Sequence, residues 1–456
     1  MGGFLRGGRG VRLALICFGV WLNAADSLVT STIMPTVGRE LGGYAYFSWA
    51  TAAYMVGAIL SGATAARLSA RFGLRNAMVA AGLVTAVGCV ISAVAPGMVT
   101  LVAGRWVQGV GSGWIVGACY AAIGAIFPER HLARIFGVMT SIWGVATVLG
   151  PLVGGVFAEA GAWRALFWVF AVQCLVFVAA AILLLKSAAP AAEARTPWGQ
   201  LTLVLAGVAL IGWADLTGSL AFASGLCLAS VAVFIAAVRI PTGVRDSLFP
   251  SAAGDPRSVV GAGYLSYFAL TAASMGFGVY APALLQKLYG LSPLVAGYAA
   301  GLEALGWTVA ALAVAGLADR WHGAIIRLGA ACVVVSLALL AVVMRTGPLA
   351  AILAAATLLG SGFGFTSGFI GRRVIAAAPD GERELASAGI NSVRLVGNAA
   401  GACLAGIIAN LLGLAAGVSL AAAQASAVWL FALAIPVAVV GAAASWRVAA
   451  LQPSEA

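Results

Sequence analysis

The sequence predicts an all-α polytopic membrane protein, and three observations support this fold class. Of its 456 residues, 62% are hydrophobic and only 9% are charged, whereas about a quarter of the residues in a soluble protein are charged. The mean hydropathy of the chain is +1.06. The apolar residues form long runs that recur through the whole sequence. A run of about 20 such residues is long enough to cross a bilayer as a helix.

The apolar runs predict about fourteen membrane-spanning helices. The first run follows several arginines, as in a signal peptide, but it continues to Pro35 without a clear cleavage site, so we expect an uncleaved helix. The seventh and eighth helices are separated only by a very short turn around Asp215. The predicted spans, in order, cover residues 11–36, 44–66, 75–95, 98–127, 133–158, 163–186, 198–215, 217–239, 258–285, 293–318, 324–345, 347–371, 385–413 and 418–446.

The positions of the basic residues support these spans. Nineteen of the 25 Lys and Arg residues fall in the predicted cytoplasmic segments and four in the outer segments, while Arg105 and Arg394 lie inside helices. Cytoplasmic loops of membrane proteins are enriched in Lys and Arg. We therefore predict an integral protein of the cell (inner) membrane with both termini in the cytoplasm. The same bias explains the net charge of +11 without a nucleic-acid partner.

A glycine-rich stretch, GVATVLGPLVGG at residues 144–155, predicts a close helix–helix contact. Gly150 and Gly154 lie four positions apart, and Gly155 follows Pro151 by the same spacing. These positions share one helix face, which lets a neighbouring helix approach closely, and the proline is expected to kink the helix. The stretch resembles motif C of the major facilitator superfamily, which its antiporter branches carry. A packing helix of another kind of membrane protein is the alternative.

Two further stretches resemble motif A of the same superfamily. They read ARLSARFGLR at residues 66–75, between the second and third predicted helices, and GLADRWHG at residues 316–323. Two copies imply two related six-helix halves with a substrate site between them near the bilayer midplane. The first copy has Ala70 where the motif carries an aspartate, which in the family helps to lock the cytoplasmic side. The resemblance therefore implies that the lock rests here on Arg71, Arg75 and backbone contacts, or that it is weaker. The gating candidates are Arg71, Gly73, Arg75, Asp319 and Arg320.

The resemblance extends over nearly the whole chain and implies a domain organisation. It is similar to the fourteen-helix drug:proton antiporters, in which two additional helices lie between the halves. We therefore expect a major facilitator fold with an N-terminal six-helix half at residues 1–190 and two extra helices with linkers at residues 191–245. The C-terminal six-helix half would follow at residues 246–456.

Four charged residues are predicted to lie deep in the membrane: Asp26, Arg105, Glu303 and Arg394. A charge at the centre of a spanning helix costs about 2.5–3.5 kcal/mol on insertion scales, so such residues are functional candidates. The segment ADSLVTSTIMP around Asp26 resembles the helix 1 signature of the branch, and LVAGRWVQGVGSG around Arg105 resembles motif B. At a rise of about 1.5 Å per residue these two lie at similar depth and are expected to pair. A static ion pair is the alternative to proton coupling.

Glu303 and Arg394 belong to the second half. Glu303 has no obvious cationic partner in its own half except Arg394, and an unpaired buried carboxyl suits proton binding. Glu303 is therefore a predicted proton-coupling residue together with Asp26 and Arg105. An acid that only faces a water-filled cavity is the alternative. Arg394, in NSVRLVGNAAG, resembles an Asn-x-x-Arg-x-x-Gly stretch of the same branch, and it could contact substrate or pack near the inner gate.

Aromatic side chains are candidates for a substrate cavity, because aromatic faces attract organic cations. Trp49 and Tyr54 lie in FSWATAAYMVGA, which resembles a Trp…Ala-Tyr signature of the branch. Aromatic residues that only pack or form interfacial belts are the alternative. The predicted substrate-binding residues are Trp49, Tyr54, Trp114, Tyr120, Trp143, Tyr267, Tyr280, Trp307 and Arg394.

Other classes of function lack support in the sequence. There is no Gly-x-x-x-x-Gly-Lys-Ser/Thr motif for ATP, and two isolated histidines with scattered cysteines predict neither a metal site nor a catalytic triad. The seven cysteines all lie in apolar runs, so free thiols are expected. We expect no cofactor and no enzymatic activity.

The resemblance implies a proton-coupled exporter that works by alternating access. Its partners would be a small, lipophilic or cationic substrate such as a drug, protons and membrane lipids, and we expect a monomer. An exporter of an endogenous metabolite, lipid or siderophore on the same fold is one alternative. A membrane sensor that does not transport is an alternative of another class.

Overall fold

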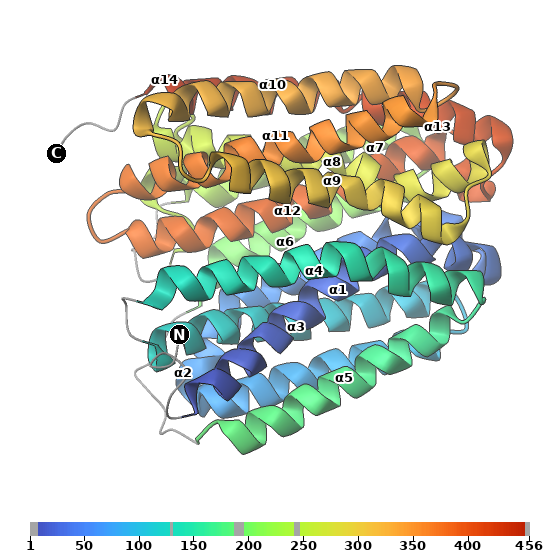
Figure 1. Cartoon of the computed structure of the whole chain (residues 1–456). Helices are drawn as coiled ribbons and strands as arrows, with labels where there is room; N and C mark the ends of the chain where they lie inside the picture. Colours follow the sequence, from blue (N-terminus) through green and yellow to red (C-terminus); the bar gives the residue numbers. More distant parts are fainter. Residues whose placement is uncertain (1–7, 128–130, 187–195, 241–246, 452–456) are drawn as a thin grey trace. The chain divides into compact units, whose positions relative to one another are not determined.

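The computed structural model describes residues 8–127, 131–186, 196–240 and 247–451 (Figure 1). The described part is helical, and it contains twelve helices that are long and apolar enough to cross a membrane. This confirms the all-α polytopic fold class. The main helices are α1 (Arg9–Leu41), α2 (Trp49–Ala93), α3 (Met98–Ile126), α4 (Leu132–Glu159), α5 (Trp163–Leu184), α6 (Trp198–Asp215), α7 (Leu220–Arg239), α8 (Val259–Tyr289), α9 (Pro293–Val314), α10 (Asp319–Val343), α11 (Leu349–Ala376), α12 (Arg383–Leu411), α13 (Leu420–Ala432) and α14 (Ile435–Ala450).

Tertiary contacts divide the chain into two compact units. The first unit comprises Met1–Gly42 and Ala53–Thr196, and the second comprises Gly43–Ala52 and Pro197–Ala456. The predicted boundaries after residues 190 and 245 both fall outside the described residues, as do the chain termini. The predicted division into two halves and an inserted helix pair therefore stays a prediction.

In the first unit, α1 packs against α3, α4 and α5. The helix α2 runs through residues 66–75, where the sequence predicts a loop, and its only break is at Gly73, with φ 74° and ψ 157°. The predicted break between the second and third spans is therefore present at Gly73. It takes a single residue instead of a ten-residue loop, because Ala, Leu and Arg favour a helix and one glycine at positive φ is sufficient to redirect the chain.

In the second unit, α9 and α10 both pack against α11, and α12 and α14 pack against α8. The α6–α7 helix pair packs against α12 through α6. The predicted last span, residues 418–446, consists of two helices, α13 and α14, with the break just before Pro436. Proline lacks a backbone donor and is favoured in the first turn of a helix, so a new helix begins there.

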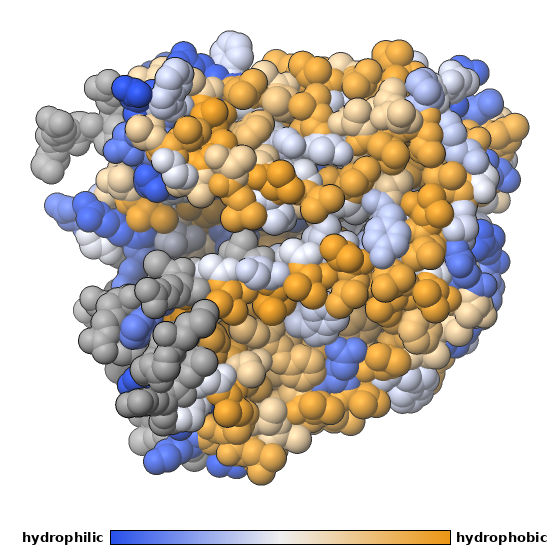
Figure 2. All heavy atoms as spheres, viewed as in Figure 1, coloured by the Kyte–Doolittle hydropathy of each residue, from blue (hydrophilic) through white to orange (hydrophobic). Residues whose placement is uncertain are grey.

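The outward faces of the helices are apolar. Leu183, Leu228 and Val342 are 82%, 72% and 74% exposed, and Figure 2 shows apolar side chains along the helix flanks between hydrophilic helix ends. Such exposure suits hydrocarbon surroundings, in which helices satisfy their own backbone groups. All seven cysteines are free, as the sequence predicts.

Candidate functional site

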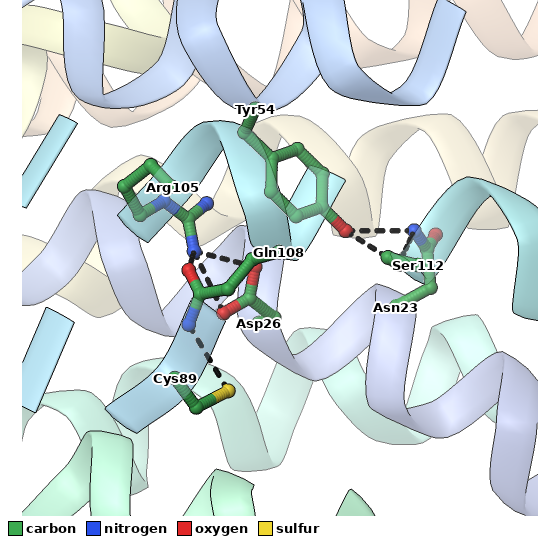
Figure 3. Close-up of polar contacts among 7 residues, drawn as sticks. All are labelled: Asn23, Asp26, Tyr54, Cys89, Arg105, Gln108 and Ser112. Carbon is green, nitrogen blue, oxygen red and sulfur yellow. Dashed lines mark hydrogen bonds and ion pairs between the residues drawn. The ribbon is translucent and has the colours of Figure 1, made fainter. Parts of the chain in front are cut away.

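The centre of the first unit contains a buried ion pair between α1 and α3. Asp26 is 7% exposed and Arg105 is 2% exposed. Nη1 of Arg105 donates to both carboxylate oxygens of Asp26, at 2.8 and 2.7 Å (Figure 3). The contact that helix depth predicts from the sequence is therefore present. Because each partner compensates the other's charge, neither can move into apolar surroundings alone without a large cost.

Further groups surround the guanidinium group of Arg105. Its Nη1 also donates to Oε1 of Gln108 at 2.7 Å, and Nε2 of Gln108 donates to Sγ of Cys89 at 3.0 Å. The ring of Tyr54 lies with its centroid 4.5 Å from the guanidinium carbon. Figure 3 shows these side chains converging from three helices. Arg105 is thus held by a carboxylate, an amide and an aromatic face, and a small cavity lies beside Asp26, Tyr54 and Gln108.

A second polar cluster lies one turn away along α1. Nδ2 of Asn23 donates to Oη of Tyr54 at 2.9 Å and to Oγ of Ser112 at 2.8 Å, and Oη of Tyr54 lies 2.7 Å from that Ser112 oxygen. Tyr54 therefore joins the two clusters, because its ring contacts Arg105 and its hydroxyl contacts Asn23. A movement of the ion pair would therefore change side-chain contacts of α1, α2 and α3 together.

Glycines bring these helices close enough for the contacts. A Cβ on Gly109 would lie 2.0 Å from the backbone oxygen of Tyr54, and a Cβ on Gly57 would lie 2.3 Å from that of Trp106. Distances this short are impossible for a real side chain, so α2 and α3 touch through their backbones. This contact sets the Tyr54 ring beside Arg105.

The glycine stripe of α4 lies against α1. A Cβ on Gly150 would lie 2.7 Å from Cβ of Leu28, and a Cβ on Gly154 would lie 3.0 Å from Cβ of Thr32. Pro151 and Gly155 are buried on the same helix. Leu28 follows Asp26 by two positions, so the stripe supports the part of α1 that carries the ion pair.

Glu303 and Arg394 lie in the second unit and, unlike Asp26 and Arg105, do not form a described ion pair with each other. Glu303 is half-buried on α9, and no described residue forms a hydrogen bond or ion pair with its carboxylate. The guanidinium carbon of Arg394 lies 5.0 Å from the ring centroid of Trp307, which stacks on Phe363 at 5.2 Å. Glu303 and Trp307 are four residues apart and therefore share one face of α9.

The other aromatic candidates are divided between the two units. Tyr267 is buried and donates to the backbone oxygen of Ser367, and Nε1 of Trp114 donates to Thr64 at 2.8 Å. Tyr120 and Trp143 are 52% and 43% exposed. The two remaining candidates, Trp49 and Tyr280, lie near the start of α2 and on α8.

The gating candidates lie near helix ends or bends. Asp319 begins α10, where the helix dipole favours an acid, and its Oδ1 lies 3.5 Å from Nε2 of His322 and 3.6 Å from Nη1 of Arg372. Because the Asp319 side chain is 92% exposed, these contacts stabilise the fold only weakly. The basic candidates Arg71 and Arg320 each lie over the next aromatic ring in sequence, while Arg75 follows the bend at Gly73.

A further buried acid, not among the residues that the sequence predicts for the site, is Asp215. Asp215 is 2% exposed, although it lies at the very end of α6, where the sequence predicts only a short turn. Its carboxylate accepts hydrogen bonds from Ser48 and Asn410. The only sequence signal is an acid at the end of an apolar run, because both partners lie far away along the chain.

Comparisons with known proteins find relatives over most of the chain. The sequence profile of the Major Facilitator Superfamily matches residues 16–402. A Mycobacterium tuberculosis protein named "Probable multidrug-efflux transporter" is 30% identical over 413 residues, which cover 86% of this chain and 86% of the relative. The "Multidrug efflux pump SdrM" of Staphylococcus aureus is 25% identical over 293 residues, which cover 63% of this chain and 64% of the pump.

Solved structures share the fold. The structure of a bacterial homologue of the human lysosomal transporter Spinster has a TM-score of 0.69 and covers 97% of both chains. Its sequence is 12% identical, so this likeness concerns the fold alone.

Proposed function

The chain belongs to the Major Facilitator Superfamily, and from this premise we propose that it is a proton-coupled exporter of lipophilic or cationic small molecules. The observation that carries the proposal is the buried Asp26–Arg105 pair. A full ion pair deep in a spanning helix is costly, and it offers a charge that a proton can remove. The names of the relatives from Mycobacterium tuberculosis and Staphylococcus aureus support multidrug efflux as the direction and substrate class.

The proposed coupling step is the neutralisation of Asp26. A proton on this carboxylate would weaken its attraction to Arg105, and the guanidinium could then turn toward other partners. Because Tyr54 contacts both Arg105 and Asn23, the change would reach α1, α2 and α3. The chain would then exchange between inward- and outward-open states, with Gly73, Asp319 and the neighbouring basic residues controlling the cytoplasmic side.

Glu303 would provide the exchange between proton and substrate. Its carboxylate has no described hydrogen-bond or ion-pair partner, so it can hold either a proton or a cationic substrate. It cannot hold both, because the protonated acid carries no charge. Trp307 on the same face of α9 would contact the apolar body of the substrate, since aromatic faces attract organic cations. Mutual exclusion at one carboxyl is the physical basis of antiport.

The test is transport by the purified protein in proteoliposomes with an imposed proton gradient. A panel of lipophilic cations, neutral drugs and lipid-like compounds would be offered, and the uptake of each would be compared with and without an ionophore that collapses the gradient. Gradient-dependent movement of lipophilic cations is the expected result. If only a metabolite or a lipid is transported, the proposed substrate class is wrong and the transporter assignment stands. If the ionophore does not change the rate of transport, the proposed proton coupling is wrong.

A further inference from the structure

The second unit contains a buried carboxyl, Asp215, at the C-terminal end of α6. Oγ of Ser48 donates to its Oδ2 at 2.5 Å, and Nδ2 of Asn410 donates to its Oδ1 at 2.8 Å. Ser48 belongs to the segment Gly43–Ala52, and Asn410 lies near the end of α12. Both partners are neutral donors. The site therefore solvates an ionised carboxylate with hydrogen bonds but supplies no opposite charge.

The backbone of α12 approaches this carboxyl closely at Gly406. A Cβ on Gly406 would lie 2.4 and 2.5 Å from the two carboxylate oxygens of Asp215 and 2.5 Å from Oγ of Ser48. Only glycine leaves room for the acid and the serine together. The carboxyl is therefore an integral part of the packing between α6, α12 and the segment.

The same cluster attaches the segment Gly43–Ala52 to the rest of the second unit. Nδ2 of Asn410 also donates to the backbone oxygen of Ala45 at 3.0 Å and to that of Asp215 at 3.1 Å. Phe47 of the segment stacks on Tyr280 of α8, with ring centroids 5.3 Å apart. Two polar contacts thus attach the segment: the hydrogen bond from Asn410 to Ala45 and the one from Ser48 to Asp215. Both Asn410 and Ser48 also donate directly to the carboxylate of Asp215.

The charge on Asp215 has no cationic partner within the described residues. The titratable groups that face it are Tyr280 of α8 and Cys403 of α12, and neither provides a positive charge. An unpaired charge buried in a membrane protein is costly. Proton uptake removes that cost, so the site has a physical reason to bind a proton.

Protonation would also rearrange the hydrogen bonds. A neutral carboxyl has one O–H donor and less capacity to accept. Oδ1 of Asn410 is buried and has no hydrogen-bond partner in the described structure, so it can accept a hydrogen bond from the O–H of the protonated carboxyl. To do so the amide must turn its oxygen toward Asp215, and its nitrogen then turns away from the oxygen of Ala45.

We propose that Asp215 is a proton-binding site that controls the segment Gly43–Ala52: the ionised carboxylate holds the segment, and the protonated acid releases it. On the proposed topology this end of α6 faces the outside, from which protons arrive. The inference goes beyond the export function, because it concerns a site and a movement that need no substrate.

Hydrogen exchange measured by mass spectrometry tests this in the whole protein. The rate of amide hydrogen exchange would be measured from about pH 5 to about pH 8 in peptides that cover residues 43–52. Each rate would be divided by the intrinsic exchange rate at that pH, so that only the change in protection remains. In the wild type, protection should fall at low pH, by on the order of tenfold. In Asp215→Asn protection should be low at every pH. Asp380→Asn, which changes an exposed acid, should behave as the wild type.

A second variant covers the case in which Asp215→Asn does not fold. Ser48→Ala removes one donor to the ionised carboxylate and keeps the acid, so the release should move to higher pH. Protection of residues 43–52 that does not change with pH in the wild type would overturn the proposal. So would an unchanged pH dependence in either Ser48→Ala or Asp215→Asn. None of these outcomes bears on gradient-driven export, which is measured separately.

Discussion

The carboxylate of Asp26 accepts two hydrogen bonds from one nitrogen, Nη1 of Arg105, at 2.8 and 2.7 Å. Both residues are almost fully buried, so the pair replaces water as the solvent for each charge. Removing one member of such a pair leaves the other charge buried and uncompensated, which is strongly unfavourable. The contact between Asp26 and Arg105 therefore depends on both charges being present.

Asp26→Asn should slow transport while leaving substrate binding nearly unchanged. The amide keeps the shape of the acid but leaves Arg105 without its counter-charge, so the chain should be held in one of its states. We expect the transport rate to fall by at least about tenfold, equivalent to about 1.4 kcal/mol in the barrier. Transport in proteoliposomes and binding by a fluorescence titration would measure the two effects, with Asp380→Asn as a matched exposed control. Equal loss of binding and transport would contradict the assignment.

The pair was predictable from the sequence, and Asp215 was not. Asp26 and Arg105 stand out as charges inside apolar runs, and the rise per residue places them at similar depth. Asp215 ends its run, and its partners Ser48 and Asn410 lie 167 and 195 residues away. A single sequence contains no signal that joins such distant positions.

The ends of helices are also harder to predict from the sequence than the presence of the helices. Apolar runs identify the spanning helices because the bilayer requires a minimum length. The motif at residues 66–75 was read as a loop, although the backbone departs from helical geometry only at Gly73. The break predicted by this motif is present, but it is shorter than predicted because arginine and alanine are good helix formers and extend the helix up to the glycine.

Gly150→Leu should abolish transport with the protein still inserted in the membrane. The new side chain would begin 2.7 Å from Cβ of Leu28, so α4 and α1 would have to separate. Gly144→Leu is the matched control on the same helix, since a Cβ there meets nothing within 4 Å. Transport would be measured alongside the amount of protein in purified membranes. If Gly150→Leu transports as well as Gly144→Leu, the close contact between α4 and α1 at Gly150 is not required for transport.

A reporter fused after Trp446 should be active in the cytoplasm. This follows from an even number of spanning helices and from the inside bias of Lys and Arg. Fusions with alkaline phosphatase and green fluorescent protein, which are active on opposite sides of the membrane, would be compared at this position. Phosphatase activity there would require an odd number of spans and would contradict the fourteen-helix prediction.

Glu303→Gln should uncouple transport from the proton gradient. Glutamine resembles the protonated acid, so it cannot attract a cation and cannot release a proton. We therefore expect cation binding to weaken by on the order of tenfold and the pH dependence of binding to disappear between about pH 6 and about pH 8. Asp26→Asn serves as the comparison, because its binding should keep that pH dependence while its transport slows. Binding and gradient-driven transport of one lipophilic cation would be measured for both variants. If Glu303→Gln still moves the cation uphill with the pH dependence of the wild type, then this carboxyl is not where proton and substrate compete, and the proposed cationic substrate class loses its main support.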